Sequence, residues 1–259
     1  MALTGQVAIV TGAGGGIGKA TALALAEAGA HVVTADINPQ SAEETANAVR
    51  AFQRRGLAVP ADVGNLHDID RMAQRTMEVF GRIDILVNNA GVTRRADIME
   101  LTEADWDHIH RVNAKGVFFR LQRVAREMIP RCSGRVINIA SIAGKGYAGT
   151  SNAAYAASKG AVISLTKTAA QQLGKHNINI NAICPGVTRT SLSNANLQIR
   201  ARQEGVTIEE MDHRRVKDIP LQRANDPEDI AAMAVFLASP GARNITGQSY
   251  NVDGGIIPD

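Results

Sequence analysis

The chain has 259 residues, of which 45% are hydrophobic and 20% charged, a composition typical of a globular protein with a sizeable core. Its net charge of +3 is small, its basic residues are scattered and its aromatic content is only 3%, which together argue against a nucleic-acid partner. No apolar run is long enough to span a membrane, the first residues lack the layout of a signal peptide, and the two cysteines lack metal-ligand spacing. We therefore expect a cytoplasmic protein with neither membrane contact nor metal.

The first half of the chain alternates strand-like and helix-like segments. The expected strands are residues 7–10, 31–35, 57–59 and 83–87. The expected helices are residues 16–28, 39–55 and 65–80. Repeating β-α-β units with short turns favour a parallel sheet covered by helices on both faces. Ligands of such sheets bind beyond the carboxyl ends of the strands.

The second half continues the alternation up to one unusual stretch. The expected elements are a long helix at about 102–129, a strand at 134–140, a helix at 153–173, a strand at 179–183, a helix at 227–238 and a strand at 248–252. The segment 187–220 is polar and shows no clear period, so we expect it to be irregular, with a substrate lid at about 188–220. No internal repeat or linker is evident, so we expect residues 1–259 to form a single domain.

A glycine-dense turn joins the first strand to the first helix. It contains Gly12, Gly14, Gly15, Gly16 and Gly18. Glycine lets a pyrophosphate approach the backbone, and the positive end of the helix dipole favours the negative charge. Asp36 ends the next apolar run, roughly 20 residues on, where a carboxylate can bind the adenosine ribose. These features predict a dinucleotide site; the simpler alternative is a surface turn and a loop aspartate.

Four polar side chains of the second half are candidates for proton transfer. Tyr155 and Lys159 share one face of a predicted helix, and an ammonium beside a phenol lowers the phenol pKa. Such a tyrosine can act as a general base toward an alcohol or a general acid toward a carbonyl, although the pair alone could be chance neighbours on a solvated face. Ser141 ends a strand and could bind a substrate oxygen or simply form a turn. Asn113 lies inside a helix, where a poor helix former indicates a solvated face or a kink that holds water.

Six motifs occur in the order and spacing of one known family. They are Thr11-Gly12-xxx-Gly16-Ile17-Gly18, Asn88-Asn89-Ala90-Gly91, Asn113, Ser141, Tyr155-xxx-Lys159 and Pro185-Gly186-xxx-Thr190. Over essentially its whole length the chain resembles the short-chain dehydrogenase/reductases. The resemblance implies an α/β fold of the doubly wound Rossmann type, with a seven-stranded parallel sheet in a single domain.

The resemblance also implies a role for each catalytic candidate. Tyr155 would be the acid/base, and Lys159 would lower its pKa and bind the nicotinamide ribose. Ser141 would hold and polarise the substrate oxygen. Asn113 would order a water that connects Lys159 to solvent as a proton relay. The hydride itself would belong to the cofactor.

The cofactor contacts implied by the resemblance surround the same sheet edge. Besides Tyr155 and Lys159 they are Gly12, Gly14, Gly15, Gly16, Ile17, Gly18, Asp36, Ile37, Asp62, Val63, Asn89, Ala90, Gly91, Pro185, Gly186, Thr188 and Thr190. A carboxylate at Asp36 would accept hydrogen bonds from the ribose hydroxyls and repel a 2′-phosphate. Relatives that use the phosphorylated cofactor usually carry a basic residue where this chain has Gly15 or Ile37. We therefore expect NAD and not NADP.

The sequence says less about the substrate. Arg94 and Arg95 could face an acidic substrate, although solvated surface charges are the more ordinary interpretation. Acyl-carrier-protein reductases of the family often carry an arginine near the place of Gln171 or Gln172. The lack of an arginine at this place favours a free secondary alcohol as substrate, such as a small polyol, a sugar or a cyclic alcohol.

Two alternative functions and an oligomeric state are also expected. The alternatives are a 3-oxoacyl-thioester (acyl-carrier-protein) reductase and, more remotely, a non-catalytic protein that senses NAD. The terminal motif Val252-Asp253-Gly254-Gly255 and the two long helices resemble the family's subunit contacts, so we expect a homotetramer.

Overall fold

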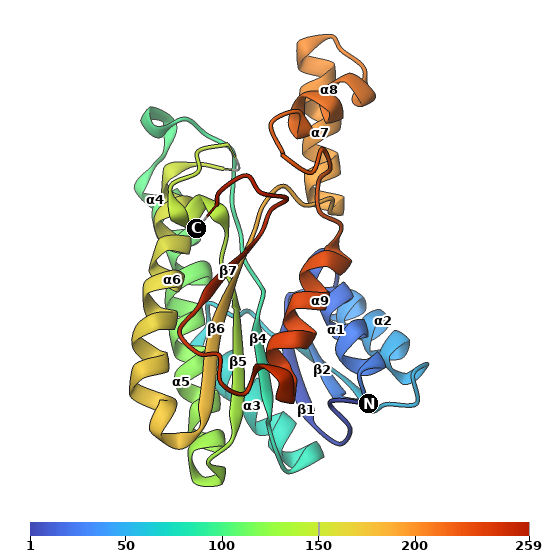
Figure 1. Ribbon diagram of the computed structural model, residues 1–259, viewed down its shortest axis with the longest axis vertical. Helices are drawn as coiled ribbons and strands as arrows, with labels where there is room; N and C mark the ends of the chain where they lie inside the picture. The colour runs from blue at the N-terminus through green and yellow to red at the C-terminus, as the bar shows by residue number, and fades with distance from the viewer. Residues whose placement is uncertain (150, 259) are drawn as a thin grey trace.

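A parallel β-sheet runs through the centre of the computed structural model, which describes residues 1–149 and 151–258 (Figure 1). Its strands are β1 (Val7–Thr11), β2 (His31–Asp36), β3 (Gly56–Pro60), β4 (Ile85–Asn88), β5 (Gly134–Ile139), β6 (Ile178–Pro185) and β7 (Ser249–Val252). In the described residues the strand order is β3-β2-β1-β4-β5-β6-β7, with every neighbouring pair parallel. The order reverses between β1 and β4, which opens a crevice at the carboxyl edge of the sheet. The predicted doubly wound fold with seven strands is confirmed.

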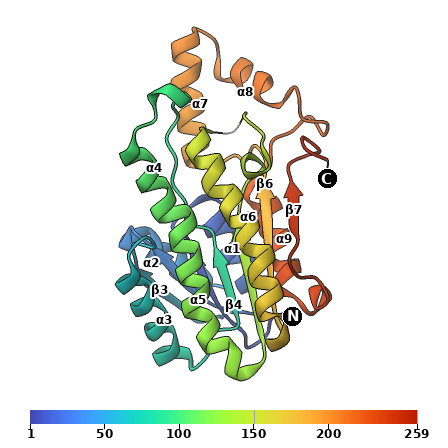
Figure 2. The same cartoon turned by 90° about the vertical axis from the view of Figure 1, so that its left-hand side faces the viewer.

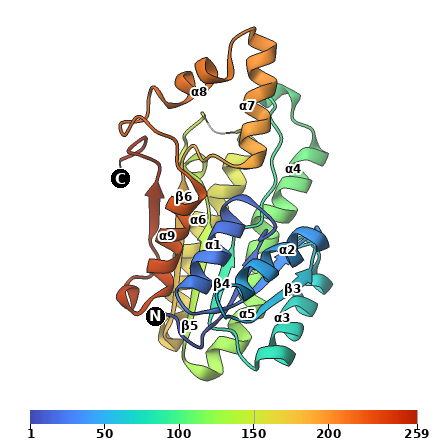
Figure 3. The same cartoon turned by 90° about the vertical axis from the view of Figure 1, so that its right-hand side faces the viewer.

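Helices cover both faces of the sheet. One face carries α1 (Gly16–Glu27), α2 (Pro39–Arg50) and α9 (Pro227–Ala238), which are seen in front in Figure 3. The other carries α3 (Leu66–Phe80), α5 (Gly116–Met128) and α6 (Ala153–Leu173), which are seen in Figure 2. Successive strand residues alternate between the two cores: Ile85 packs in the first and Leu86 in the second. The strands are therefore apolar throughout, because both of their faces are buried.

The predicted long helix at 102–129 is interrupted. It consists of α4 (Glu103–His110), a π-helical turn (Arg111–Lys115) and α5. At this turn the amide of Gly116 donates to the carbonyl of Arg111, five residues earlier. A Cβ on Gly116 would lie 2.4 Å from the carbonyl oxygen of Val63, so only glycine allows α5 to approach the loop after β3 this closely. π-helical turns of this kind are frequent at functional sites, and this one contains Asn113.

The segment predicted to be irregular contains two helices, and that prediction was wrong. They are α7 (Ser191–Glu204) and α8 (Ile208–Val216), which extend beyond the carboxyl edge of the sheet at the top of Figure 1. The hydroxyls of Thr190 and Thr207 cap the two helices. A small apolar cluster of Leu197, Ala201 and Met211 holds the pair together. We call residues 188–220 the lid segment.

Candidate active site

A cavity of about 1050 Å³ lies at the carboxyl edge of the sheet, between the glycine turn and the lid segment. Predicted residues that line it are Gly12, Gly15, Gly16, Ile17, Asp36, Ile37, Asp62, Val63, Asn89, Ala90, Gly91, Ser141, Tyr155, Lys159, Pro185, Gly186, Thr188 and Thr190. The fold therefore gathers residues from almost every predicted motif around one hollow. Its size is that of a site for a large ligand.

The glycine turn provides both a cradle and close packing. Gly12 and Gly16 have φ of +64° and +50°, a conformation that glycine adopts without strain. Gly14 and Gly18 do not line the cavity. A Cβ on Gly14 would lie 2.9 Å from Asp36 Oδ2, and one on Gly18 would lie 2.0 Å from the carbonyl oxygen of Gly12. The structure thus gives these two glycines a role in packing the turn against its neighbours.

Asp36 connects the glycine turn to the end of β2. Its Oδ2 accepts a hydrogen bond from the amide of Gly14 at 2.8 Å, and its Oδ1 accepts one from the amide of Asn38 at 2.9 Å. Each carboxylate oxygen can accept a further bond, and the side chain lines the cavity. The carboxylate is therefore fixed in place at the point where the ribose hydroxyls are expected.

The end of the cavity lined by the loop after β3 contains an ion pair that the sequence did not predict. Asp62 Oδ2 accepts from Arg111 Nη1 at 2.8 Å, and Oδ1 accepts from the amide of Gly64 at 2.8 Å. Burial alone would raise the pKa of Asp62, but the Arg111 hydrogen bond and the Gly64 amide hold it below its ordinary value. Arg111 belongs to the π-helical turn, so this ion pair connects the turn to the loop after β3.

Tyr155, Lys159 and Ser141 meet at the cavity wall, as predicted. The side chain of Ser141 hydrogen bonds the phenol of Tyr155 and accepts a bond from the amide of Ala143 at 3.1 Å. Lys159 is buried; its Nζ donates to the carbonyl of Ile139 at 2.7 Å and lies 5.7 Å from the centre of the Tyr155 ring. Burial, assisted by the positive charge of Arg120, lowers the pKa of Lys159 to about 8.

The pKa of Tyr155 departs from the expectation. Burial raises it above the ordinary value for a phenol, although the hydrogen bond with Ser141 acts in the opposite direction. The sequence predicted a lowered pKa for Tyr155. The pKa is raised instead, because burial destabilises the phenolate more than the Ser141 hydrogen bond stabilises it. Tyr155 is therefore protonated at neutral pH.

Comparison with known proteins identifies the family of the chain. A family model described as enoyl-(acyl carrier protein) reductase matches residues 12–257. The chain belongs to the short-chain dehydrogenase/reductase family. It is 40% identical to a 3-oxoacyl-[acyl-carrier-protein] reductase of Synechocystis sp., covering 99% of this chain and 98% of the relative. It is also 40% identical to a 2-dehydro-3-deoxy-D-gluconate 5-dehydrogenase of Dickeya dadantii, covering 98% and 96%. A crystal structure of NAD⁺-bound xylitol dehydrogenase superposes with a TM-score of 0.91 at 32% identity, covering 98% and 100%.

Within this short-chain dehydrogenase/reductase, Asn113 fixes the backbone beside Lys159. Its Oδ1 accepts from the amide of Val92 at 2.8 Å, and its Nδ2 donates to the carbonyl of Val92 at 2.9 Å and to Ser158 Oγ at 3.1 Å. Both amide hydrogens are thus used by protein partners. A water bound here would need the second lone pair of Oδ1 or a main-chain group, and the water relay stays a prediction.

A buried arginine is the second feature that the sequence did not reveal. Arg120 on α5 has no exposed surface. Its Nε donates to Asn88 Oδ1 at 2.7 Å and its Nη1 to the carbonyl of Val63 at 3.1 Å, whereas Nη2 has no partner among the described residues. Asn88 Nδ2 in turn donates to Asn138 Oδ1 at 2.9 Å. A continuous network of buried polar side chains therefore connects α5 to β4 and β5.

The opposite end of the cavity is bounded by the lid segment and by loops after β4 and β5. The residues there are Thr93, Arg94, Arg95, Tyr147, Ser151, Leu197, Arg214, Arg215 and Asp218. Arg94 reaches Asp105 with Nε at 2.7 Å and Nη2 at 2.9 Å. No described helix is long and apolar enough to cross a bilayer, and no three described His, Cys, Asp or Glu residues group as metal ligands do.

Proposed function

We propose that this protein is an NAD-dependent oxidoreductase that transfers a hydride between the nicotinamide and a secondary alcohol or its ketone. The observation that carries the proposal is the convergence of Tyr155, Ser141 and Lys159 on the same cavity that begins at the glycine turn. A small polyol, sugar or cyclic alcohol is the favoured substrate. Relatives that act on xylitol and on a dehydro-deoxy-gluconate support this choice.

The residues around the cavity fit a dinucleotide. A Cβ on Gly15 would meet nothing within 4 Å, so the turn is open toward the cavity at the N-terminus of α1. Free amides at that terminus suit a pyrophosphate, and Asp36 suits the adenosine ribose. When bound, the cofactor would supply the site that accepts or donates hydride. Asp62, Val63, Asn89, Ala90 and Gly91 would hold the adenosine half.

The protein residues would supply proton transfer and orientation. In ketone reduction the Tyr155 hydroxyl donates its proton to the carbonyl oxygen while the Ser141 hydroxyl holds that oxygen. The Lys159 ammonium favours the phenolate that remains. Alcohol oxidation uses the same groups in reverse, with the phenolate as base.

The preference for NAD is proposed from charge. The carboxylate of Asp36 lines the cavity, where it would repel a 2′-phosphate. Neither Gly15 nor Ile37, which also line the cavity at this end, offers a compensating cation. The NAD⁺-bound structure of the xylitol dehydrogenase supports this assignment.

A 3-oxoacyl-thioester reductase is the second candidate. It is supported by the similarity to the Synechocystis reductase and by the description of the matching family model. A non-catalytic NAD sensor would have no use for the retained Ser141, Tyr155 and Lys159 and is not favoured.

The test follows NADH absorbance in both directions with alditols, sugars, cyclic alcohols and an acetoacetyl thioester, each with NAD(H) and NADP(H). Tyr155→Phe should abolish turnover of the active substrate and leave NADH binding nearly intact. Activity only with the thioester would favour the second candidate. Retained turnover in Tyr155→Phe would exclude the mechanism.

A further inference from the structure

The lid end of the cavity is lined by an excess of guanidinium groups. Arg94 and Arg95 contribute from the loop after β4, and Arg214 and Arg215 from α8. Asp218 is the one carboxylate among the described lining residues at this end. Neither Asp36 nor Asp62 balances these charges, because both lie at the adenosine end.

The carboxylates that pair with Arg94, Arg214 and Arg215 lie outside the cavity lining. Asp105 pairs with Arg94, and Asp212 pairs with Arg215. Glu204 and Glu210 pair with Arg214 at 3.2 and 3.0 Å. A carboxylate on one side of a guanidinium fixes its orientation and uses only part of its five N–H groups. The remaining donors are then available to a ligand in the cavity.

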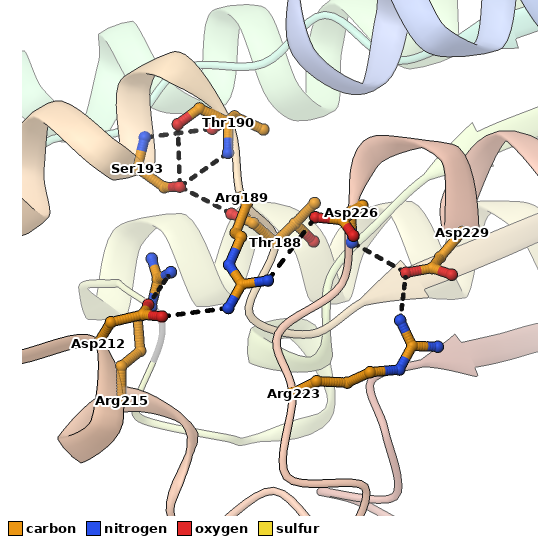
Figure 4. Close-up of polar contacts among 9 residues, drawn as sticks. All are labelled: Thr188, Arg189, Thr190, Ser193, Asp212, Arg215, Arg223, Asp226 and Asp229. Atoms are coloured by element: carbon orange, nitrogen blue, oxygen red, sulfur yellow. Dashed lines mark hydrogen bonds and ion pairs between the residues drawn. The ribbon is translucent and has the colours of Figure 1, made fainter. Parts of the chain in front are cut away.

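Arg215 is the best placed of these groups. Its side chain is only 15% exposed, and its Nη2 donates to Asp212 Oδ1. Its Nε is shielded from solvent, so a ligand would meet the outer nitrogens of the guanidinium. Figure 4 shows that Asp212 lies between Arg215 and Arg189. Arg189 Nη2 donates to Asp212 Oδ2 at 3.1 Å, and its Nη1 lies 3.9 Å from Asp226 Oδ1. One carboxylate is thus shared by two guanidiniums, and Arg215 is only partly neutralised.

The two arginines of this network have separable positions. Arg189 does not line the cavity and connects α8 to Asp226, the N-cap of α9. Arg215, at the end of α8, lines the cavity. Arg189 is therefore placed to hold the lid segment, and Arg215 to meet what lies beneath it.

Resting on the proposed function, we propose that Arg215, with Arg214 beside it, binds a carboxylate of the substrate, so that the alcohol or ketone is a hydroxy acid or sugar acid. A guanidinium offers two parallel N–H groups that match a carboxylate. Arg189, Arg214 and Arg215 are matched by three carboxylates, Asp212, Glu204 and Glu210, so the cluster has little net charge and offers directed N–H donors. Such a site suits a monoanionic carboxylate better than a phosphate dianion.

The experiment compares acid and neutral substrates of equal carbon number, namely gluconate with glucitol, galactonate with galactitol, and 3-hydroxybutyrate with 2-butanol. The ratio of kcat/KM for acid over neutral substrate is measured with NAD in the wild type and in three variants. Arg215→Met should lower this ratio roughly ten- to hundredfold, the effect of losing one charged hydrogen bond. Arg189→Met should lower both rates alike, because it loosens the lid segment without changing the cavity lining.

The matched control is Arg223→Met. Arg223 pairs with Asp229 at 3.2 Å in the neighbouring part of the network and does not line this cavity (Figure 4). It should leave the ratio unchanged. Equal losses for acid and neutral substrates in Arg215→Met, or a wild-type preference for the alditols, would overturn the inference and leave the proposed function standing.

If no substrate is turned over, a binding measurement distinguishes the proposed carboxylate site from the proposed oxidoreductase function. Calorimetric titration of gluconate into the enzyme–NADH complex should give binding that Arg215→Met weakens and Arg223→Met does not. Such binding without turnover of any alcohol would contradict the proposed function and support the anion site. Absence of binding by gluconate, galactonate and 3-hydroxybutyrate, or tighter binding of 6-phosphogluconate through Arg215, would contradict the carboxylate site.

Discussion

Arg120 donates from Nε to Asn88 Oδ1 across 2.7 Å in a part of the protein without solvent. The same guanidinium donates to the carbonyl of Val63, so it joins the loop after β3 to the end of β4. Burial lowers the pKa of Arg120 to about 9, and its charge contributes to the lowered pKa of Lys159. A buried cation thus connects Val63 at the cavity wall to Lys159.

We predict that Arg120→Gln raises the pKa of Lys159 from about 8 toward its ordinary value of 10.5. Burial, the largest cause of the shift, remains in the variant, as do Tyr155 and Cys184 beside the lysine, so the change is partial. The alkaline limb of the pH profile for ketone reduction should move to higher pH. Arg120→Lys keeps the charge and should keep the limb. Loss of thermal stability with an unmoved limb would show that Arg120 has a packing role alone.

The wild-type enzyme should show opposite pH dependence in its two directions. Reduction needs the Tyr155 phenol and the Lys159 ammonium; burial raises the pKa of Tyr155 and lowers that of Lys159 to about 8. Reduction should therefore fall as pH rises above about 8. Oxidation needs the phenolate and should increase as pH rises from neutrality. Initial rates with saturating cofactor, measured from pH 6 upward, test this, and a reduction rate that climbs above pH 8 would contradict it.

Asp36→Asn should relax the preference for NAD over NADP. The amide oxygen can still accept from Gly14 or Asn38, but the charge that repels a 2′-phosphate is gone. We expect the ratio of kcat/KM for NAD over NADP to fall at least about tenfold, the effect of roughly 1.4 kcal/mol. Ile37→Arg is the complementary change, because Ile37 is exposed and lines the cavity. It should raise activity with NADP, whereas a wild type that prefers NADP would refute the assignment.

Local pattern in the sequence was enough to predict the strands, the glycine turn and the shared face of Tyr155 and Lys159. Local pattern could not predict contacts between residues that lie far apart in the chain. Arg111 pairs with Asp62 across 49 residues, and nothing near either residue in the sequence signals the other. The two lid helices were missed for a related reason: their apolar residues are few, and they pack on one another rather than on the sheet.

Asp84 should stabilise the fold from the end of the sheet opposite the cavity. This buried carboxylate accepts from the amide of Val7 at 2.9 Å, from two nitrogens of Arg82 at 2.8 Å and from Arg131. Asp84→Asn leaves two arginines without their anion, so the free energy of unfolding should fall by about 2–4 kcal/mol. Urea unfolding measures this, and kcat should be unaffected because Asp84 does not line the cavity.

The stabilisation provided by Asp84 should depend on pH in a defined direction. Burial would raise the pKa of Asp84, but Arg82, Arg131 and the Val7 amide hold it below 3.8. The stabilisation is therefore fully present above the unfolded-state value of 3.8 and is lost as pH falls through the lower folded-state value. Wild type and Asp84→Asn should converge in stability at low pH; a constant difference down to the acid transition would contradict the assignment.

We also propose a homotetramer, and α4 and α5 carry the features that test it. Trp106 on α4 and Phe118 on α5 are 47% and 41% exposed, and exposed aromatic side chains are enriched where subunits meet. Light scattering at micromolar concentration should give four times the chain mass of 27.4 kDa. Phe118→Asp should reduce that mass, because it places a charge in the contact. Phe52→Asp, a change at an aromatic residue exposed to a similar extent just after α2, should not. A monomeric wild type would contradict the tetramer. Equal masses for the wild type and both variants would contradict a subunit contact through α5.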